Sequence, residues 1–336
     1  MRVRSTPHVL AVCALLGCGG SSAEQRPAAN SGDARLAETE HAVPEASALV
    51  REGEAKLAQN DASGAKALFE QALHASDKDA RAALDLGIAE EMLGDLPAAE
   101  AAYRRALAAQ PDFAEAQNNL GVFLRESGKL PEAIGLLKRA AASAPDSAAA
   151  HQNLALAFED SGDLAAAASE YARAVEIAPN DAMTRANYGL LLLKQQQRDA
   201  AVRELSKALD AAQGNRPALL AIGNGLRRAG AADEALRAMQ AAVAAGGEAP
   251  TPALLSELAL AQHAAGKRDE AIATMQKVLA QDEKYATGHY LLANMLASDK
   301  RFGEAKQHYE RYLKLEPSGD QAARARERLA VIQKHK

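Results

Sequence analysis

The sequence has no tryptophan, only two cysteines and few aromatic side chains. Both cysteines, Cys13 and Cys18, lie close to the start of the 336-residue chain, and aromatic residues make up 4% of it. The rest of the chain can therefore form no disulfide and no cysteine-based metal site. A basic excess is also missing, since 39 basic and 44 acidic residues give a net charge of -5. This balance argues against a surface dedicated to nucleic acid, so we expect no nucleic-acid partner.

The apolar run near the N-terminus is too short to cross a membrane. At ~1.5 Å per residue, a helix from Val9 to Cys18 reaches about 15 Å, whereas the hydrocarbon core is ~30 Å thick. Arg2 and Arg4 precede this run, and small residues follow it. A positive region, a short apolar stretch and small residues are together typical of a secretion signal.

The end of this run, Leu-Leu-Gly-Cys at residues 15–18, resembles the lipobox of bacterial lipoproteins. The resemblance implies that residues 1–17 are a signal peptide and that Cys18 carries fatty acyl chains such as palmitate. Two or more chains anchor a protein stably, so Cys18 would be a lasting membrane tether. Gly19 rather than aspartate follows the cysteine, which in the enterobacterial version of the family favours the outer membrane, facing the periplasm. The alternative is an ordinary signal peptide in which Cys18 is incidental.

The segment after the cysteine is expected to be a flexible tether. Residues 18–44 are rich in serine, glycine, proline and charge and contain few large apolar side chains. Such a segment cannot bury enough apolar surface to offset the entropy lost on ordering. Alanine, the best helix former and a poor strand residue, makes up roughly a quarter of the whole chain, which favours an all-α fold beyond this segment.

The most regular feature of the sequence is a repeat of 34 residues. A small residue recurs at this period, with one step of 36, at Gly53, Gly87, Gly121, Ala155, Gly189, Gly223, Ala259 and Ala293. Twelve residues after each small residue lies an alanine: Ala65, Ala99, Ala133, Ala167, Ala201, Ala235, Ala271 and Ala305. Four residues further on the side chain is large and apolar: Phe69, Tyr103, Leu137, Tyr171, Leu205, Met239, Met275 and Tyr309. Internal repetition at this period predicts stacked units of one kind.

Four of the repeats also place a proline at the boundary with the next segment: Pro111, Pro145, Pro179 and Pro317. Together with the small, alanine and large apolar positions, these prolines resemble the tetratricopeptide repeat, W-x₂-L-G-x₂-Y…A-x₃-F…P. The resemblance covers residues 45–317, although no repeat has tryptophan at the first position. It implies an all-α fold, an α-solenoid of about eight helix pairs, in which residues 318–336 form a C-terminal capping helix.

Each unit is predicted to be two amphipathic helices that cross at small side chains. The small residue of the first helix and the alanine of the second meet at the crossing, so a side chain larger than methyl would push the helix axes apart. One pair cannot bury its apolar face alone, so neighbouring pairs stack and the core runs along the array. In the final segment Ala322, Ala325, Leu329 and Ile332 share one face, as a capping helix requires.

The sequence lacks the motifs of common catalytic sites. It contains no Walker-type phosphate loop, no HExxH pair and no GxSxG elbow. Residues 223–225 begin a dinucleotide-like glycine pattern, but they lie inside a repeat with no preceding strand. The eight histidines are scattered, and His151 and His289 occupy the repeat's tryptophan position, where we expect them to pack. We therefore predict that the protein is not an enzyme and has no metal and no cofactor.

In arrays of this family the first helix of each pair lines a concave groove that binds extended peptides or partner helices. Three repeats place asparagines at the same position of this helix, Asn119, Asn153 and Asn187, and Asn224 extends the polar lining. An asparagine amide both donates and accepts, so a row of asparagines can hold a peptide backbone. The alternative is that asparagine is simply frequent at this position of the repeat.

Charge along the predicted groove is uneven, with acidic residues in its first half and basic residues later. Arg125 lies among the acidic residues, which include Glu159, whereas Arg227 and Arg228 belong to the basic part. A protein or peptide partner with basic and acidic portions would be oriented by this pattern, although solvated surface charge also explains it.

The leading hypothesis is a lipid-tethered scaffold of the bacterial cell envelope that binds other proteins in its groove. Within that class the chain resembles pilus-assembly lipoproteins, which implies a role in assembling an envelope complex such as a pilus. The alternative function is a regulatory subunit of an envelope enzyme such as a cell-wall hydrolase. A spacer without a ligand is a third possibility.

Overall fold

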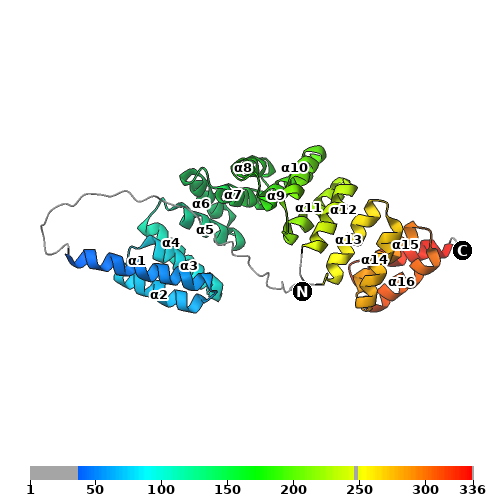
Figure 1. The fold of residues 1–336 in the computed structure, drawn as a ribbon, viewed down its shortest axis with the longest axis horizontal. Coiled ribbons are helices and arrows are strands. Elements are labelled where there is room, and N and C mark those ends of the chain that lie inside the picture. The colour runs from blue at the N-terminus through cyan, green and yellow to red at the C-terminus, as the bar shows by residue number, and fades with distance from the viewer. Residues whose placement is uncertain (1–36, 246–248, 335–336) are drawn as a thin grey trace.

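A computed structural model describes residues 37–245 and 249–334, all of whose regular elements are helices. The helices follow one another along an elongated, curved array from α1 at one end to α17 at the other (Figure 1). Each odd-numbered helix from α1 to α15 packs most closely against the even-numbered helix that follows it, so the array is built from antiparallel pairs. This arrangement confirms the predicted all-α solenoid.

The eight pairs and the final helix are found where the 34-residue period predicts them. The first helices of the pairs are α1 (Ala37–Ala58), α3 (Ala80–Leu93), α5 (Ala114–Glu126), α7 (Ala148–Ser161), α9 (Ala182–Lys194), α11 (Arg216–Ala229), α13 (Pro252–Ala264) and α15 (Ala286–Ser298). The second helices are α2 (Ala62–Ala75), α4 (Leu96–Ala109), α6 (Leu130–Ser143), α8 (Leu164–Ile177), α10 (Arg198–Ala211), α12 (Ala232–Ala244), α14 (Arg268–Gln281) and α16 (Phe302–Leu315). The array ends in α17 (Ala322–Lys334).

The tight turn inside each pair depends on one residue with a positive φ. In the second repeat Gly94 has φ 82° and ends α3, while the side chain of Asp95 caps α4 by accepting a hydrogen bond from the backbone N–H of Ala98 at 3.1 Å. Glycine enters this left-handed conformation at no steric cost, and aspartate is a favoured N-cap. The corresponding residue is not glycine in three repeats: Asn60, Gln196 and Lys300.

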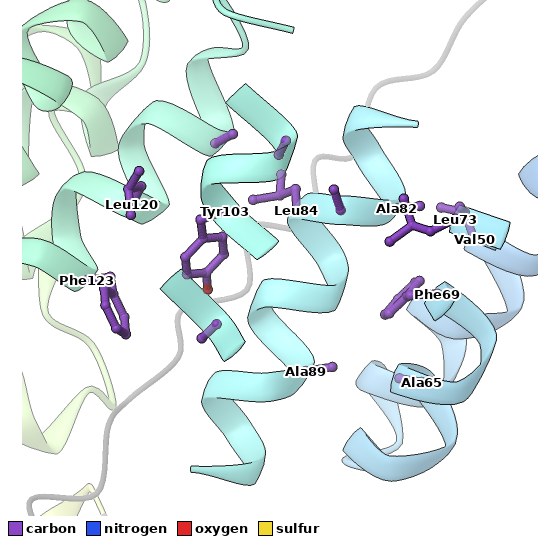
Figure 2. Close-up of a cluster of buried hydrophobic side chains, with 14 of the residues drawn as sticks. Val50, Ala65, Phe69, Leu73, Ala82, Leu84, Ala89, Tyr103, Leu120 and Phe123 are labelled. Atoms are coloured by element: carbon purple, nitrogen blue, oxygen red, sulfur yellow. The ribbon is translucent and has the colours of Figure 1, made fainter. Parts of the chain in front are cut away.

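Small residues at the crossing let the two helices of a pair approach closely. A Cβ atom added to Gly121 would lie 2.6 Å from Cγ of Leu137 and 3.4 Å from the carbonyl oxygen of Ala133. In the first two repeats the large apolar residues Phe69 and Tyr103 occupy the same place and are fully buried (Figure 2). The predicted contact between small, alanine and large positions therefore forms the centre of each pair.

The core continues from one pair to the next. A single cluster of buried side chains runs from Val50 in α1 to Leu136 in α6, and Tyr103 meets Phe123 edge to face across a repeat boundary. At the C-terminal end Ala322, Ala325 and Ile332 are buried, while the arginines of α17 stay exposed. This helix covers the apolar end of the array, as predicted for a cap.

Two predictions concern residues at or beyond the N-terminal end of the array. Helix α1 begins at Ala37, so the part of the predicted tether from Ala37 to Pro44 belongs to a helix rather than to a flexible segment. The predicted signal peptide and Cys18 lie outside the described residues. Among the helices of residues 37–245 and 249–334, none combines the length and the apolar character needed to cross a membrane.

Candidate functional site

The first helices of the pairs line the inner side of the curved array. Several neighbouring first helices pack against one another, such as α5 with α7 and α9 with α11. Ion pairs join others, such as Arg81 of α3 with Glu115 of α5. In the part of the chain that the structure describes, second helices pack less closely on one another, although Arg104 of α4 lies 2.8 Å from Glu132 of α6. The array therefore curves toward its first helices. We define the "inner face" as three positions of each first helix: two residues before, one residue after and five residues after the small residue. These positions are three and four residues apart, so their side chains lie on the same side of the helix.

The asparagines predicted to bind a partner lie on this inner face and are half-buried. Asn153 Nδ2 donates a hydrogen bond to Oδ1 of Asn118 at 2.9 Å, and Asn118 Nδ2 donates to Oδ1 of Asn119 at 3.3 Å. The amides of α5 and α7 are thus linked through Asn118. Asn187 occupies the same position of α9.

Asn118 is a residue that the sequence interpretation missed. It is adjacent to Asn119, and Gln152 occupies the same position in the next repeat, where it accepts a hydrogen bond from the hydroxyl of Thr184. The sequence does show amide side chains at this position, three residues before the small residue, in two consecutive repeats. The row at Asn119 and Asn153 is therefore joined through the neighbouring position instead of forming a direct ladder.

The asparagines further along the array take part in internal hydrogen bonds. Asn224 Oδ1 accepts from Nη2 of Arg227 at 3.2 Å, and Nη2 of Arg227 lies 3.9 Å from Glu257 of the next repeat. Asn294 Oδ1 accepts from the hydroxyl of Tyr309 at 2.6 Å. These contacts orient the side chains within the array.

The charged residues predicted for the groove pair with one another across neighbouring repeats. Nε of Arg125 lies 3.7 Å from Asp160, and Glu159 forms an ion pair with Lys194. Glu159 also accepts a hydrogen bond from the hydroxyl of Tyr171 at 3.3 Å. Each of these ion pairs joins residues 35 apart, so it connects adjacent first helices.

Arg228 differs from the other predicted charged residues because its side chain is exposed. It lines a small cleft of about 250 Å³ together with Leu193, Gln196, Arg198 and Ala229. This cleft lies between the turn of the fifth repeat and the end of α11, at the edge of the inner face.

The first repeats carry an acidic cluster around one guanidinium. Arg81 bonds to Glu54 at 2.9 Å, to Asp85 at 2.9 Å and to Glu115 at 2.8 Å, which belong to α1, α3 and α5. Asp85 is only 2% exposed, and this burial raises its pKa to about 7 although Arg81 opposes the rise. Three carboxylates share one cation, so this part of the inner face is negative.

A second acidic pair lies at the end of the same helices. Burial raises the pKa of Glu91, the hydroxyl of Tyr103 at 2.8 Å lowers it, and the nearby charge of Glu126 raises it further. Glu91 and Glu126 belong to α3 and α5 and repel each other. Carboxylates therefore outnumber guanidinium groups on and beside the inner face over the first three repeats, although Arg51 and Arg125 also lie there.

The residues at the repeat's tryptophan position stabilise the array from its interior. His151 lies 2.7 Å from Glu170 through Nδ1 and 3.2 Å from the carbonyl of Pro145 through Nε2. His289 lies 2.9 Å from Nδ1 of His308 and 3.0 Å from the carbonyl of Glu283. Each histidine therefore contacts the second helix of its own repeat and the turn before its first helix, in agreement with the expected packing role. Within residues 37–245 and 249–334 no three histidine, cysteine, aspartate or glutamate side chains are placed to hold a metal ion.

The fold and the inner face define a helical-repeat protein that presents a long surface. The family model of the tetratricopeptide repeat matches residues 50–112, 93–148, 119–182 and 256–320, and the chain belongs to this family. Repeats of this family indicate protein partners. No curated protein matches the chain.

Several solved structures share the fold at low sequence identity. The pilF protein of Pseudomonas aeruginosa is 21% identical, with a TM-score of 0.54 over 60% of this chain and 91% of that one. PilW, described as a widely conserved type IV pilus biogenesis factor, is 21% identical, with a TM-score of 0.53 over 59% of this chain and 92% of its own. A chain of the APC/C hetero-tetramer Cut9-Hcn1 is 16% identical, with a TM-score of 0.52 over 89% of this chain and 58% of that one. At these identities the likeness concerns the fold.

Proposed function

We propose that the protein is a non-enzymatic scaffold that binds a protein or peptide partner on its inner face while Cys18 tethers it to a bacterial envelope membrane. The proposal rests on one observation: Asn119, Asn153 and Asn187 are half-buried on the consecutive first helices α5, α7 and α9. Hydrogen bonds through Asn118 connect the first two, so the polar surface continues from one repeat to the next. A partner laid along this surface would meet one asparagine in each of the third, fourth and fifth repeats.

The amide groups on this surface retain unused hydrogen-bonding capacity. An asparagine amide offers two N–H donors and an oxygen with two lone pairs. Asn153 uses one donor in its bond to Asn118, and its oxygen and second N–H are left for a partner or for water. The bond to Asn118 also holds the amide in one orientation, which lowers the entropy lost when a partner binds.

The tether and the location of the protein belong to the same proposal. They rest on the lipobox-like residues 15–18, with Gly19 after the cysteine. We place the protein at the outer membrane, facing the periplasm. The combination of such a signal with a tetratricopeptide array supports a role in assembling an envelope complex such as a pilus.

Photo-crosslinking in cells tests the groove. A photoreactive amino acid at Val122 should capture a partner, and changing Asn119, Asn153 and Asn187 together to alanine should lower the captured amount about tenfold, because each lost hydrogen bond costs ~0.5–1.5 kcal/mol. Helicity should not change, because alanine is the best helix former. The loss of the bonds to Asn118 should lower the melting temperature by only a few degrees.

The matched control removes three exposed amides from second helices. Gln71→Ala, Gln240→Ala and Gln276→Ala lie in α2, α12 and α14, and their combination should leave capture unchanged. Equal capture by the asparagine triple variant and the wild type would show that the groove asparagines do not bind the partner.

A further inference from the structure

A row of aliphatic side chains crosses the inner face beside the asparagines. Ile88, Val122, Leu156 and Leu190 lie one residue after the small residue of α3, α5, α7 and α9, and all four are half-buried. Three of them follow an asparagine by three residues, so they share its side of the helix. At the end of the row Leu190 reaches α11, where a Cβ atom on Gly225 would lie 2.9 Å from Cδ2 of Leu190.

The edge of the inner face has one step at which two carboxylates, instead of a carboxylate and a cation, lie 35 residues apart. Residues 35 apart face each other there, as in the pairs of Arg125 with Asp160 and of Glu159 with Lys194. One repeat earlier the same step joins Glu91 and Glu126. Nη2 of Arg125 lies 3.5 Å from Glu126, but this guanidinium also pairs with Asp160. Three carboxylates thus share one cation, so an added positive charge would be stabilised beside Glu91 and Glu126.

Charge of the opposite sign dominates at the far end of the aliphatic row. Arg227 and Arg228 end α11, and Glu257 is the acidic residue that faces Arg227 from the next repeat. The exposed Arg228 and its cleft lie beside Leu193, which follows Leu190 on the same helix. The aliphatic row therefore runs from an acidic end at α3 and α5 to a basic end at α11.

We infer that the inner face binds an extended peptide segment with lysine or arginine at the end over α3 and α5, an aliphatic residue at every third position, and acidic residues at the end over α11. This inference rests on the proposed groove function and specifies its partner. The complementary charges set the direction of the segment, and the aliphatic row sets its register.

The spacing of the repeats selects the extended conformation. Packed helices lie about 8–10 Å apart, and a polyproline II segment advances about 9.3 Å in a turn of three residues. Every third side chain of such a segment therefore meets the next repeat. In a β-strand, side chains of one face are only about 6.6 Å apart and fall out of step. The backbone groups of an extended segment are also open to the asparagine amides.

Fluorescence anisotropy with synthetic peptides tests this inference on the purified array with its full set of repeats. The probe is a labelled peptide of about 14 residues with two lysines at one end, leucine at every third position, two glutamates at the other end, and proline and serine between. It should bind at least about tenfold more tightly than a peptide of the same composition with leucine at every second position. Raising the salt from about 25 mM to about 250 mM should weaken the binding.

A second experiment reverses the charge of one of the two facing carboxylates, Glu91 and Glu126. Glu126→Lys places a cation beside Glu91 and should lower the affinity for the probe about fivefold to tenfold, with a smaller salt dependence. Glu176→Lys on α8 makes the same change in net charge at an exposed site of a second helix and should leave the affinity within about twofold.

Three outcomes would overturn the inference. They are equal binding of the two leucine spacings, equal effects of the two charge reversals, and no binding of the probe. If the probe fails while photo-crosslinking at Val122 still captures a partner that depends on the asparagines, the scaffold function stands and the partner's chemistry is different.

Discussion

Polar side chains replace tryptophan at the first position of several repeats, and they act as internal ties. Gln117 and Arg185 donate hydrogen bonds to the carbonyls of Pro111 and Pro179, six residues earlier, just as His151 and His289 contact carbonyls at the same spacing. Each contact joins the start of a first helix to the turn before it. A planar or long polar side chain at this position thus satisfies a backbone carbonyl in the turn.

The histidine pair of the eighth repeat should make stability depend on pH. Because Nε2 of His289 donates to the carbonyl of Glu283, its Nδ1 must accept the proton that His308 donates at 2.9 Å. Burial, followed by the charge of His289, lowers the pKa of His308 below its ordinary value of 6.5, while Glu304 opposes this shift. The unfolded chain then binds more protons than the folded one, so this contribution is present above pH 6.5 and is lost as the pH falls below it.

His308→Gln tests this effect, because glutamine can still donate to His289 but does not titrate. Between pH 7.5 and pH 5.5 the melting temperature of the wild type should fall about 2 °C more than that of the variant. Differential scanning calorimetry at both pH values measures the difference. Parallel curves for the two proteins would show that the pair does not titrate in this range.

At the scale of the helices, the contact between the small and large positions determines how closely the two members of a pair approach. A Cβ atom on Gly121 would lie 2.6 Å from Leu137, and one on Gly189 would lie 2.7 Å from Leu205. Ala155 places a methyl group opposite Tyr171, whereas a Cβ atom on Gly87 would lie 2.5 Å from Tyr103, the tyrosine at the same position of the second repeat. The room at the crossing therefore depends on how the large side chain is placed in each pair, and not on its type alone.

Two glycine-to-alanine substitutions in the same repeat separate helix propensity from packing. Alanine at Gly135, where nothing lies within 4 Å of the new Cβ, should stabilise the array by about 0.5–1 kcal/mol. Alanine at Gly121 should instead destabilise it by about 1–2 kcal/mol, because overpacking against Leu137 outweighs the same propensity gain. Urea unfolding monitored by circular dichroism gives both values, and stabilisation by Gly121→Ala would refute this overpacking.

At the scale of the whole molecule, curvature brings charges of successive repeats together. Residues 35 apart in sequence pair because neighbouring first helices touch along the inner face, as Glu159 and Lys194 show. Second helices pack less closely on one another, and the ion pair of Arg104 with Glu132 joins α4 to α6 on the outer surface. Residues from separate repeats thereby form one continuous inner face.

The proposed tether also acts at this scale, because it determines where the array is held. Cys18→Ser should abolish incorporation of an alkyne-labelled palmitate and remove the protein from the outer-membrane fraction, since the thiol that receives the lipid is lost. Cys13→Ser is the matched control, because Cys13 lies in the predicted signal peptide and its loss should leave both measurements unchanged. Labelling of the Cys18→Ser protein would contradict the lipid anchor.

Most of the fold could be predicted from the sequence, because the contacts that define each helix pair join residues of the same repeat and recur with the 34-residue period. The small residue, the alanine twelve residues later and the large residue sixteen residues later are enough to place each helix pair, and Ala322, Ala325 and Ile332 identified the cap. The candidate site was less predictable. Asn119 and Asn153 were found by their register, but the link through Asn118 was not.

The sequence by itself determined the number of helix pairs, their order and the side chains at their crossings, because each depends on residues within one repeat. Only the tertiary structure decided which polar groups of different repeats meet. Arg125 forms an ion pair with Asp160, whereas Glu91 faces Glu126, because the angle between stacked pairs brings residues 35 apart together. That angle results from the packing of all the interfaces along the array, and no single stretch of sequence encodes it.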